Sequence, residues 1–225
     1  MKRFLLIALL LSAPLWADGG KRAMTFEDVF AAARIQAPVL SPDGRLVAFT
    51  VRVADLDANK FHSAVYVVDL EGKGIRKVAG DKGNASTPGF RDAHRLTYLG
   101  TVDGETQVYE IDLAGSGEPV KLTAVPGGAG DYVWTPDARR LVFQKDVYPA
   151  AASLEGSVAQ EKARDESKVK ARLLTSLMYR VWNSWKEGMR SHLFLTTPGG
   201  TDFTDLTPGE GDTPPVDLGG PCDFA

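Results

Sequence analysis

Several features that mark other classes of protein are scarce in this sequence. Cys222 is the only cysteine, so no disulfide can form within the chain, and a small disulfide-stapled domain is excluded. The 26 Lys and Arg residues nearly balance the 29 Asp and Glu residues, which gives no reason to expect a nucleic-acid partner. The longest apolar run, Phe4 to Leu11, is too short for a membrane span, which takes about 20 residues.

Sequence patterns of catalytic and metal sites are missing as well. No serine has glycine at both second positions, so the nucleophile elbow G-x-S-x-G is absent. The zinc motif H-E-x-x-H, paired cysteine ligands and the P-loop are also absent. His62, His94 and His192 lie in or beside stretches with strand character and are predicted to be strand or turn residues. We therefore predict that this chain has no catalytic residue, no metal and no cofactor, and is inactive alone.

The first 17 residues have the layout of a signal peptide. Met1, Lys2 and Arg3 supply positive charge, the apolar run follows, and the segment ends in the small residue Ala17. Cleavage near Ala17 predicts an exported bacterial protein, periplasmic or secreted, with no membrane attachment after the signal is removed.

A short motif recurs three times along the rest of the chain. The stretches "LSPDGRLVAFT" (40–50), "FRDAHRLTYLG" (90–100) and "WTPDARRLVFQ" (134–144) align on Asp43, Asp92 and Asp137, which are 49 and 45 residues apart. Asp and its neighbours Pro and Gly are turn formers, so we interpret the three aspartates as corner residues and not as acid or base catalysts. The third corner has Ala138 where the first has Gly44, and we expect it to be built slightly differently.

Short strands are predicted around these corners, because the segments are rich in Val, Tyr, Phe and Thr and separated by turn residues. They are residues 45–51, 63–70, 94–100, 106–113, 139–145 and a later copy from 192. A unit of about 45 residues with four short strands is typical of a β-propeller blade. The fold class is therefore all-β, with residues 41–225 forming an incomplete β-propeller of about three blades of four-stranded antiparallel sheet.

Two helices are expected outside this rhythm. A short helix at 25–33 lies in a lead segment, 18–40, where Thr25 and Asp28 suit its first turn. An amphipathic helix is predicted within an insertion at about 150–190, with Ser157 and Gln160 as a capping box and Glu166 and Lys170 as an ion pair. Its apolar stripe recurs every fourth residue and consists of Val169, Leu173, Leu177, Val181 and Trp185, widened by Leu174 and Met178.

Three stretches together resemble a known family. They are "MTFEDVFAAARIQAPVLSPDGRLVAFTV" (24–51), "LLTSLMYRVWNSWKEGMRSHLF" (173–194) and "DLTPGEGDTPPVDLGGPCDFA" (205–225). They resemble the N-terminal propeller of bacterial serine peptidases of the prolyl oligopeptidase family, in the dipeptidyl-peptidase and acylaminoacyl-peptidase-like branch. The resemblance implies that the propeller gates and orients peptides for a C-terminal α/β-hydrolase domain with a Ser-Asp-His triad, which this chain lacks.

A second function remains open. TolB-like periplasmic propellers also carry SPDG repeats, so a non-enzymatic propeller that binds a protein partner is the alternative, and the tryptophan-rich insertion is the feature that separates the two. Under either reading, three blades form an arc, because closed propellers have four to eight blades. The open edges of such an arc predict self-association.

Candidate substrate contacts are Trp182, Trp185 and Glu187, since an insertion projecting from a propeller is where such a peptidase would meet the amino group of a peptide. The alternative is that both tryptophans anchor the insertion on its blade and that Glu187 is a solvated cap. In relatives two acids usually occupy the position of Lys186 and Glu187, and this departure weakens the assignment of amine binding.

Overall fold

The computed structural model describes residues 22–115, 118–174, 179–181 and 183–213. Within them, three four-stranded antiparallel sheets follow one another along the chain. The first sheet contains β1 (Arg34–Leu40), β2 (Leu46–Asp55), β3 (Lys60–Asp69) and β4 (Arg76–Ala79). The second contains β5 (Asn84–Phe90), β6 (Arg95–Val102), β7 (Glu105–Asp112) and β8 (Val120–Lys121). The third contains β9 (Tyr132–Trp134), β10 (Leu141–Val147), β13 (Arg190–Thr196) and β14 (Thr204–Asp205).

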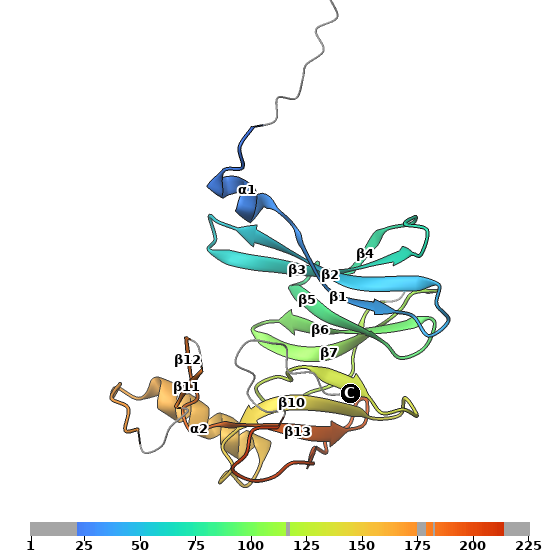
Figure 1. The fold of residues 1–225 in the computed structure, drawn as a ribbon. Helices are drawn as coiled ribbons and strands as arrows, with labels where there is room; N and C mark the ends of the chain where they lie inside the picture. The colour runs from blue at the N-terminus through green and yellow to red at the C-terminus, as the bar shows by residue number, and fades with distance from the viewer. Residues whose placement is uncertain (1–21, 116–117, 175–178, 182, 214–225) are drawn as a thin grey trace, which may run out of the picture.

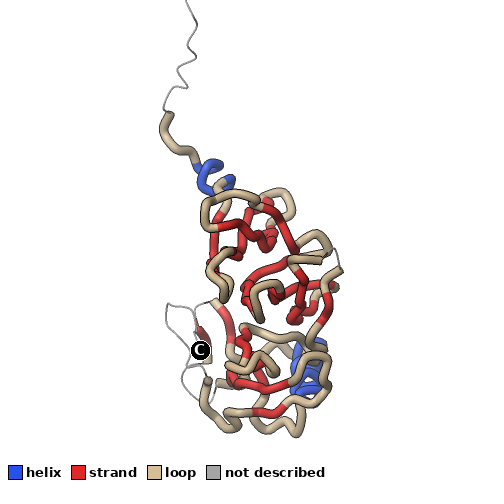
Figure 2. The backbone as a smooth tube through the Cα atoms, turned by 90° about the vertical axis from the view of Figure 1, so that its right-hand side faces the viewer, coloured by secondary structure: helices blue, strands red, loops and turns tan. Residues whose placement is uncertain are grey.

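The sheets lie one after another as blades (Figure 1), and the tube of Figure 2 shows the same succession from the side. Within each blade the spatial order of the strands equals their order in the chain, once the insertion between β10 and β13 is set aside. The predicted fold class, an all-β arc of three propeller blades, is confirmed. The signal peptide predicted at residues 1–17 and the single Cys222 lie outside the described residues.

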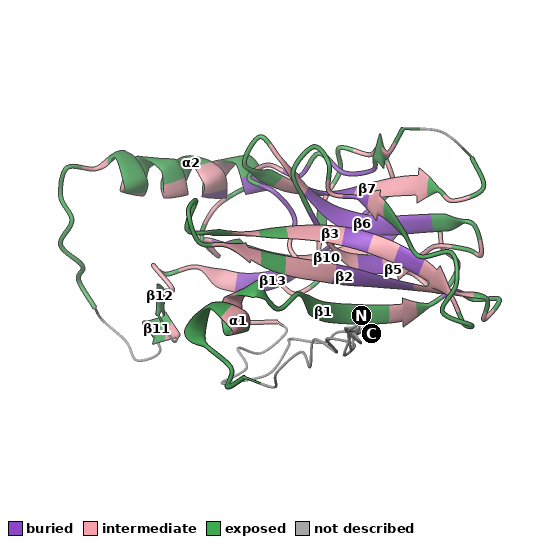
Figure 3. Cartoon of the chain, turned by 90° about the horizontal axis from the view of Figure 1, so that it is seen from above, coloured by how far each residue is buried: buried purple, intermediate pink, exposed green. Residues whose placement is uncertain are grey.

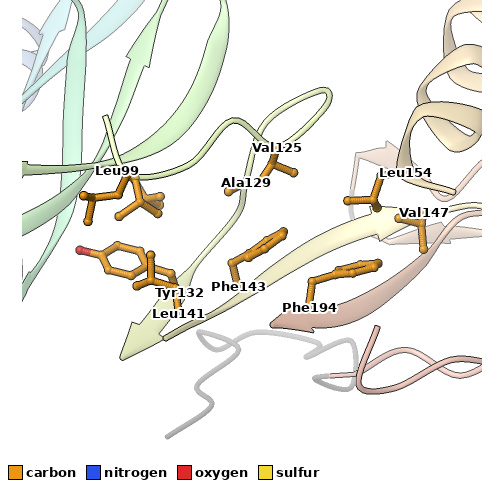
Figure 4. Close-up of a cluster of buried hydrophobic side chains, with 11 residues drawn as sticks. Leu99, Val125, Ala129, Tyr132, Leu141, Phe143, Val147, Leu154 and Phe194 are labelled. Atoms are coloured by element: carbon orange, nitrogen blue, oxygen red, sulfur yellow. The ribbon is translucent and has the colours of Figure 1, made fainter. Parts of the chain in front are cut away.

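Alternation along the strands explains why the blades pack face to face. In β10 every second side chain is buried, from Leu141 through Phe143 to Val147, and the residues at the alternate positions are more exposed. Phe143 lies opposite Phe194 of β13, and their rings stack with centroids 5.7 Å apart. Figure 4 shows these side chains between blades 2 and 3, together with Leu99 from blade 2.

Blades 1 and 2 share a second core. Ala48, Val65 and Val67 of blade 1 pack with Leu96 and Tyr98 of blade 2. Burial of apolar area at about 25 cal/mol per Å² is the main favourable term in such an interface, so each blade is stabilised chiefly by the neighbour whose face it covers.

A buried threonine joins blade 2 to blade 3 through polar contacts. Thr97 Oγ1 accepts hydrogen bonds from Tyr132 Oη at 2.9 Å and from Trp134 Nε1 at 3.1 Å, and it donates to Gly89 O at 2.8 Å. Burial raises the pKa of Tyr132 above its ordinary value. These bonds fix the lateral position of two blades that apolar packing alone would leave free to slide.

The aspartate corners are built as the repeat predicts. Asp43 Oδ1 accepts from Arg45 N at 3.2 Å, Asp92 Oδ1 from Arg95 N at 2.8 Å, and Asp137 Oδ1 from Arg139 N at 3.1 Å. The interpretation of Asp43, Asp92 and Asp137 as turn formers is confirmed.

The expectation that the third corner differs from the first is wrong. Gly44 has φ +69°, and Ala138 adopts the same left-handed conformation at φ +54°. The bonds that close the corners are also equivalent, from Gly44 N to Ser41 O at 2.9 Å and from Ala138 N to Thr135 O at 2.7 Å. The fold imposes one corner geometry, and Ala138 carries the strain that glycine avoids.

The lead segment contains α1 (Phe26–Ala31), inside the predicted range 25–33. Thr25 N donates to Asp28 Oδ2 at 2.8 Å, so Asp28 closes the first turn. The first strand of blade 1, β1, begins at Arg34 and directly follows this helix, so part of the segment taken as a lead belongs to the sheet.

The insertion departs most from its prediction. Helix α2 spans Leu154–Glu166, so it ends where the predicted apolar stripe begins. Val169 and Leu173 are exposed by 72% and 91%. Val181 lies in β11 (Arg180–Val181) and Trp185 in β12 (Ser184–Trp185), two strands that pair as a small hairpin. Leu177 and Met178 of the predicted stripe lie outside the described residues.

The predicted caps of this helix are wrong too. Ser153 is the N-cap, and its Oγ accepts from Gly156 N at 3.2 Å. Ser157 is buried, and its Oγ accepts from Tyr148 N at 2.9 Å, which ties the helix to the end of β10. Glu166 lies 3.8 Å from Lys162 within the helix, since Lys170 lies beyond the last turn.

Candidate functional site: the insertion face

One end of the propeller arc carries the connections between the second and third strands of each blade. They join β2 to β3 after Asp55, β6 to β7 after Val102, and β10 to β13 after Val147. The first two are tight turns, whereas the third holds the insertion, 148–189. Figure 1 shows α2, β11 and β12 together on the left of the blades. We call this end the insertion face.

Helix α2 is buried at its first turn, and its last turn bonds to the residue that follows β10. Leu154 is buried in the core between blades 2 and 3, and Arg164 Nη1 donates to Tyr148 Oη at 3.1 Å. The rest of the helix stands away from the sheets with most of its surface exposed (Figure 3). The insertion is therefore a projecting element with an anchored base.

Trp185 lies in the small hairpin under two arginines. Its ring stacks on Tyr179, with centroids 6.0 Å apart, and the guanidinium of Arg172 lies 4.6 Å from its centroid. Arg180 lies 5.5 Å from the same ring. Trp185 still exposes 38% of its surface, so its ring holds the insertion together and faces solvent at the same time.

Glu187 follows in a strained turn with φ +53°. Its Oε1 accepts from Arg172, at 2.7 Å from Nε and 2.6 Å from Nη2. Arg172 thus lies between the carboxylate and the Trp185 ring. An ammonium group that binds to Glu187 has to share the carboxylate with Arg172 or displace it.

Lys186 points elsewhere. Its Nζ lies 2.9 Å from Asp212 Oδ1, and the same oxygen accepts from Ser191 N at 2.8 Å. Burial of Asp212 works against its charged form, but the bonds from Ser191 and Lys186 outweigh burial and lower the pKa of Asp212. This pair ties the end of the insertion to the segment that follows blade 3.

A groove of about 440 Å³ runs between the end of α2 and the hairpin. Its walls combine an aromatic ring, two carboxylates and several cations. The residues that define it are Arg164, Asp165, Lys170, Arg172, Trp185 and Glu187. A peptide segment could lie in such a groove, because polar and charged groups there can meet both its backbone and its ends.

The structure brings two of the three predicted contact residues together. Trp185 and Glu187 both line the groove, and Trp182 lies outside the described residues. Arg172, which contacts both, could not be identified from the sequence, because Glu187 lies fifteen residues further on and the predicted helix would keep the two apart.

The histidines occupy strand and turn positions, as predicted. His62 lies in β3, His94 follows the Asp92 corner, and His192 is buried in β13. Among the described residues no group of three or more His, Cys, Asp or Glu side chains could hold a metal ion.

The chain is similar in sequence to curated peptidases over part of their length. No family model matches it. It is 28% identical to dipeptidyl-peptidase 5 of Porphyromonas endodontalis over 221 residues, which cover 92% of this chain and 31% of that protein. The chain therefore spans about a third of the length of this relative.

Two further comparisons bear on the alternatives. The TolB homologue of Chlorobium chlorochromatii is 31% identical over 106 residues, 47% of this chain and 22% of that protein. The structure of Pyrococcus horikoshii acylaminoacyl peptidase superposes with a TM-score of 0.57 and 16% identity, over 78% of this chain and 24% of that one. The likeness to dipeptidyl-peptidase 5 includes the insertion, since it covers nearly the whole chain, and the structural likeness independently shows the fold. The predicted resemblance to the propeller portion of serine peptidases of the prolyl oligopeptidase family is therefore confirmed in sequence and in fold.

Proposed function

We propose that this chain is the propeller portion of an exported serine peptidase, and that it gates and orients short peptides for a hydrolase domain that the described residues do not contain. The observation that carries the proposal is the similarity to dipeptidyl-peptidase 5 over 92% of the chain. The groove beside Trp185 and Glu187 is the proposed place of peptide contact, because the exposed indole ring suits an apolar side chain of a peptide and the partly buried carboxylate suits its amino group.

Hydrolysis assays test the assignment. The 225-residue chain alone should not hydrolyse chromogenic dipeptide substrates, whereas a form that carries a hydrolase segment with a G-x-S-x-G elbow should, with sensitivity to serine-directed inhibitors. In the active form, Glu187→Gln should raise KM for peptides with a free amino group and leave kcat nearly unchanged. Inhibitor-sensitive turnover by the short chain would overturn the assignment.

A TolB-like binding role is the second candidate, and the 31% identity over 106 residues supports it. Deleting the hairpin with its flanks separates the two functions. A binding propeller should retain its protein partner after this deletion, whereas a peptidase should lose discrimination between free and blocked peptides.

Export is part of the proposal and rests on residues 1–17. No helix among the described residues is long and apolar enough to cross a membrane. Expression in a bacterium followed by cell fractionation and N-terminal sequencing tests it, and the expected first residue of the exported chain is Asp18. A cytoplasmic chain that retains Met1 would contradict export.

We also propose that the 225-residue chain self-associates. β1 forms one edge of blade 1, and Ile35 and Leu40 on it are exposed by 68% and 52%. Such edges pair readily with other strands. Size-exclusion chromatography should show oligomers that disappear when further blades are added, and a sharp monomer peak from the short chain would contradict this proposal.

A further inference from the structure

A buried lysine in blade 3 has more N–H donors than the described residues provide acceptors for. Lys145 of β10 is only 8% exposed, and its Nζ donates to Gly128 O at 3.0 Å. An ammonium group has three donors, and no carboxylate among the described residues forms an ion pair with Lys145. Burial lowers its pKa, whereas the negative charges of Glu161, Asp146 and Glu105 act in the opposite direction.

The ammonium lies at a cavity of about 330 Å³ on the insertion face. The walls are the loop Gly127 to Gly130, the turn at Gly104, the end of β10 and Glu161 of α2. Gly127 has φ +67°, and a Cβ on it would lie 2.9 Å from Val158 and 3.2 Å from Lys145 Nζ. A side chain at this position would therefore crowd both α2 and the ammonium of Lys145.

The charges around the cavity favour one class of ligand. Lys145 lies in the wall, and Asp146 and Glu161 line the same space. Arg164 Nη2 lies 3.7 Å from Glu161 Oε1. Arg164 lies closer to Asp165, at 2.8 Å, so the cavity itself presents one ammonium beside two carboxylates. A ligand with a separate anionic and cationic group can meet both kinds of charge, whereas a dianion such as phosphate would meet two carboxylates.

We propose that this cavity binds a free amino acid or dipeptide as a zwitterion, with its carboxylate on Lys145 Nζ and its ammonium toward Glu161 and Asp146. The volume suits such a ligand, since small-molecule sites start at about 300 Å³. The site is separate from the groove beside Trp185 and does not depend on the peptide contacts proposed there.

Equilibrium dialysis of the full chain with Gly-Phe, Gly-Phe amide and N-acetyl-Gly-Phe tests the site. Gly-Phe should bind, and the amide should bind about tenfold more weakly because it cannot form the charge-assisted bond to Lys145. Acetylation should weaken binding less, since the carboxylates lie nearer to solvent.

Two variants assign the effect to one side chain. Lys145→Met keeps the apolar stem and should abolish the preference for Gly-Phe over its amide, whereas Lys121→Met, on the exposed outer strand of blade 2, should leave that preference unchanged. A thermal melt of both variants checks folding. If Lys145→Met fails to fold, the wild-type chain still decides, because Gly-Phe should protect Lys145 from reductive methylation in peptide mass spectra and the amide should not.

The proposal is overturned if wild-type chain binds the amide as well as Gly-Phe, if folded Lys145→Met keeps the preference, or if Gly-Phe leaves the methylation of Lys145 unchanged. None of these outcomes bears on whether the Trp185 groove contacts peptides, so failure here and failure of the proposed peptidase role are distinguishable.

Discussion

The blades and the insertion both show regular apolar spacing in sequence, but only in the blades does this spacing correspond to buried residues of a regular element. In β10 the buried residues alternate and face a regular partner strand, and Phe143 stacks on Phe194 across the sheet. In the insertion, Val169 and Leu173 keep the spacing of a helix but have no surface to cover, and the helix stops at Glu166. Periodicity therefore predicts an element only where the fold supplies a second layer.

The largest effect should come from removing a core residue of the blades and comparing it with the insertion. Phe143→Ala should lower the free energy of unfolding by about 3–5 kcal/mol, because it leaves a cavity between blades 2 and 3. Leu173→Ala should change it by less than about 0.5 kcal/mol, since this side chain is 91% exposed. Urea denaturation of both variants checks this, and a large loss from Leu173→Ala would mean that the insertion is packed in solution.

A second contrast concerns histidines on two strands. The His192 ring is held from both sides, with Nδ1 2.7 Å from Asp205 Oδ2 and Nε2 3.0 Å from Gly209 O. His192→Phe should cost about 2–3 kcal/mol, because it leaves a carboxylate and a carbonyl without their partner. His62→Phe is the matched control, since the side chain of His62 is 61% exposed beside Asp55. Equal melting temperatures for the two variants would refute the structural role of His192.

The strands β2, β6 and β10 and the corners before them could be predicted from sequence. The first strands of blades 1 and 2, β1 and β5, could not. β2, β6 and β10 follow a turn of known chemistry and are rich in β-branched and aromatic residues. β1 and β5 contain Pro38 and Pro88 and shift register at that point. Proline weakens a strand signal but is tolerated at bulges and edges, so only the three-dimensional repeat shows these strands.

The candidate site was predicted only in part, because some of its residues are recognisable by type and others only by their contacts in the fold. Trp185 and Glu187 were found because an aromatic and an acid near the end of an insertion are chemically conspicuous. Arg172 and Lys145 were not, since their importance depends on contacts across the fold, with the hairpin and with the glycine loop at Gly128. The sequence shows residue types, whereas the burial of a side chain and the groups that it contacts depend on how the chain packs.

Substitutions at the first and third corners should have smaller effects on stability, of opposite sign. Ala138→Gly should stabilise the protein by about 1 kcal/mol, because glycine adopts positive φ without steric cost. Gly44→Ala should destabilise it by a similar amount at the equivalent position, where φ is +69°. Parallel thermal melts measure both shifts. Changes of the same sign would mean that the corners differ in solution.

The smallest effect concerns how the end of the insertion is tied to the blade. The pKa of Asp212 is lowered in the folded protein, so its contribution to stability is present above its unfolded pKa, about 3.9, and is lost as the pH falls through the lower folded value. Asp212→Asn should therefore lower stability by up to about 1 kcal/mol at pH 7, and the difference from wild type should vanish in strong acid.

Urea melts at several pH values measure that difference. Glu71→Gln is the control, because the side chain of Glu71 is 75% exposed and lies 3.9 Å from Lys73. Its difference from wild type should be small at every pH. If Asp212→Asn keeps a constant difference down to strong acid, the Lys186 contact does not act through the charge of Asp212.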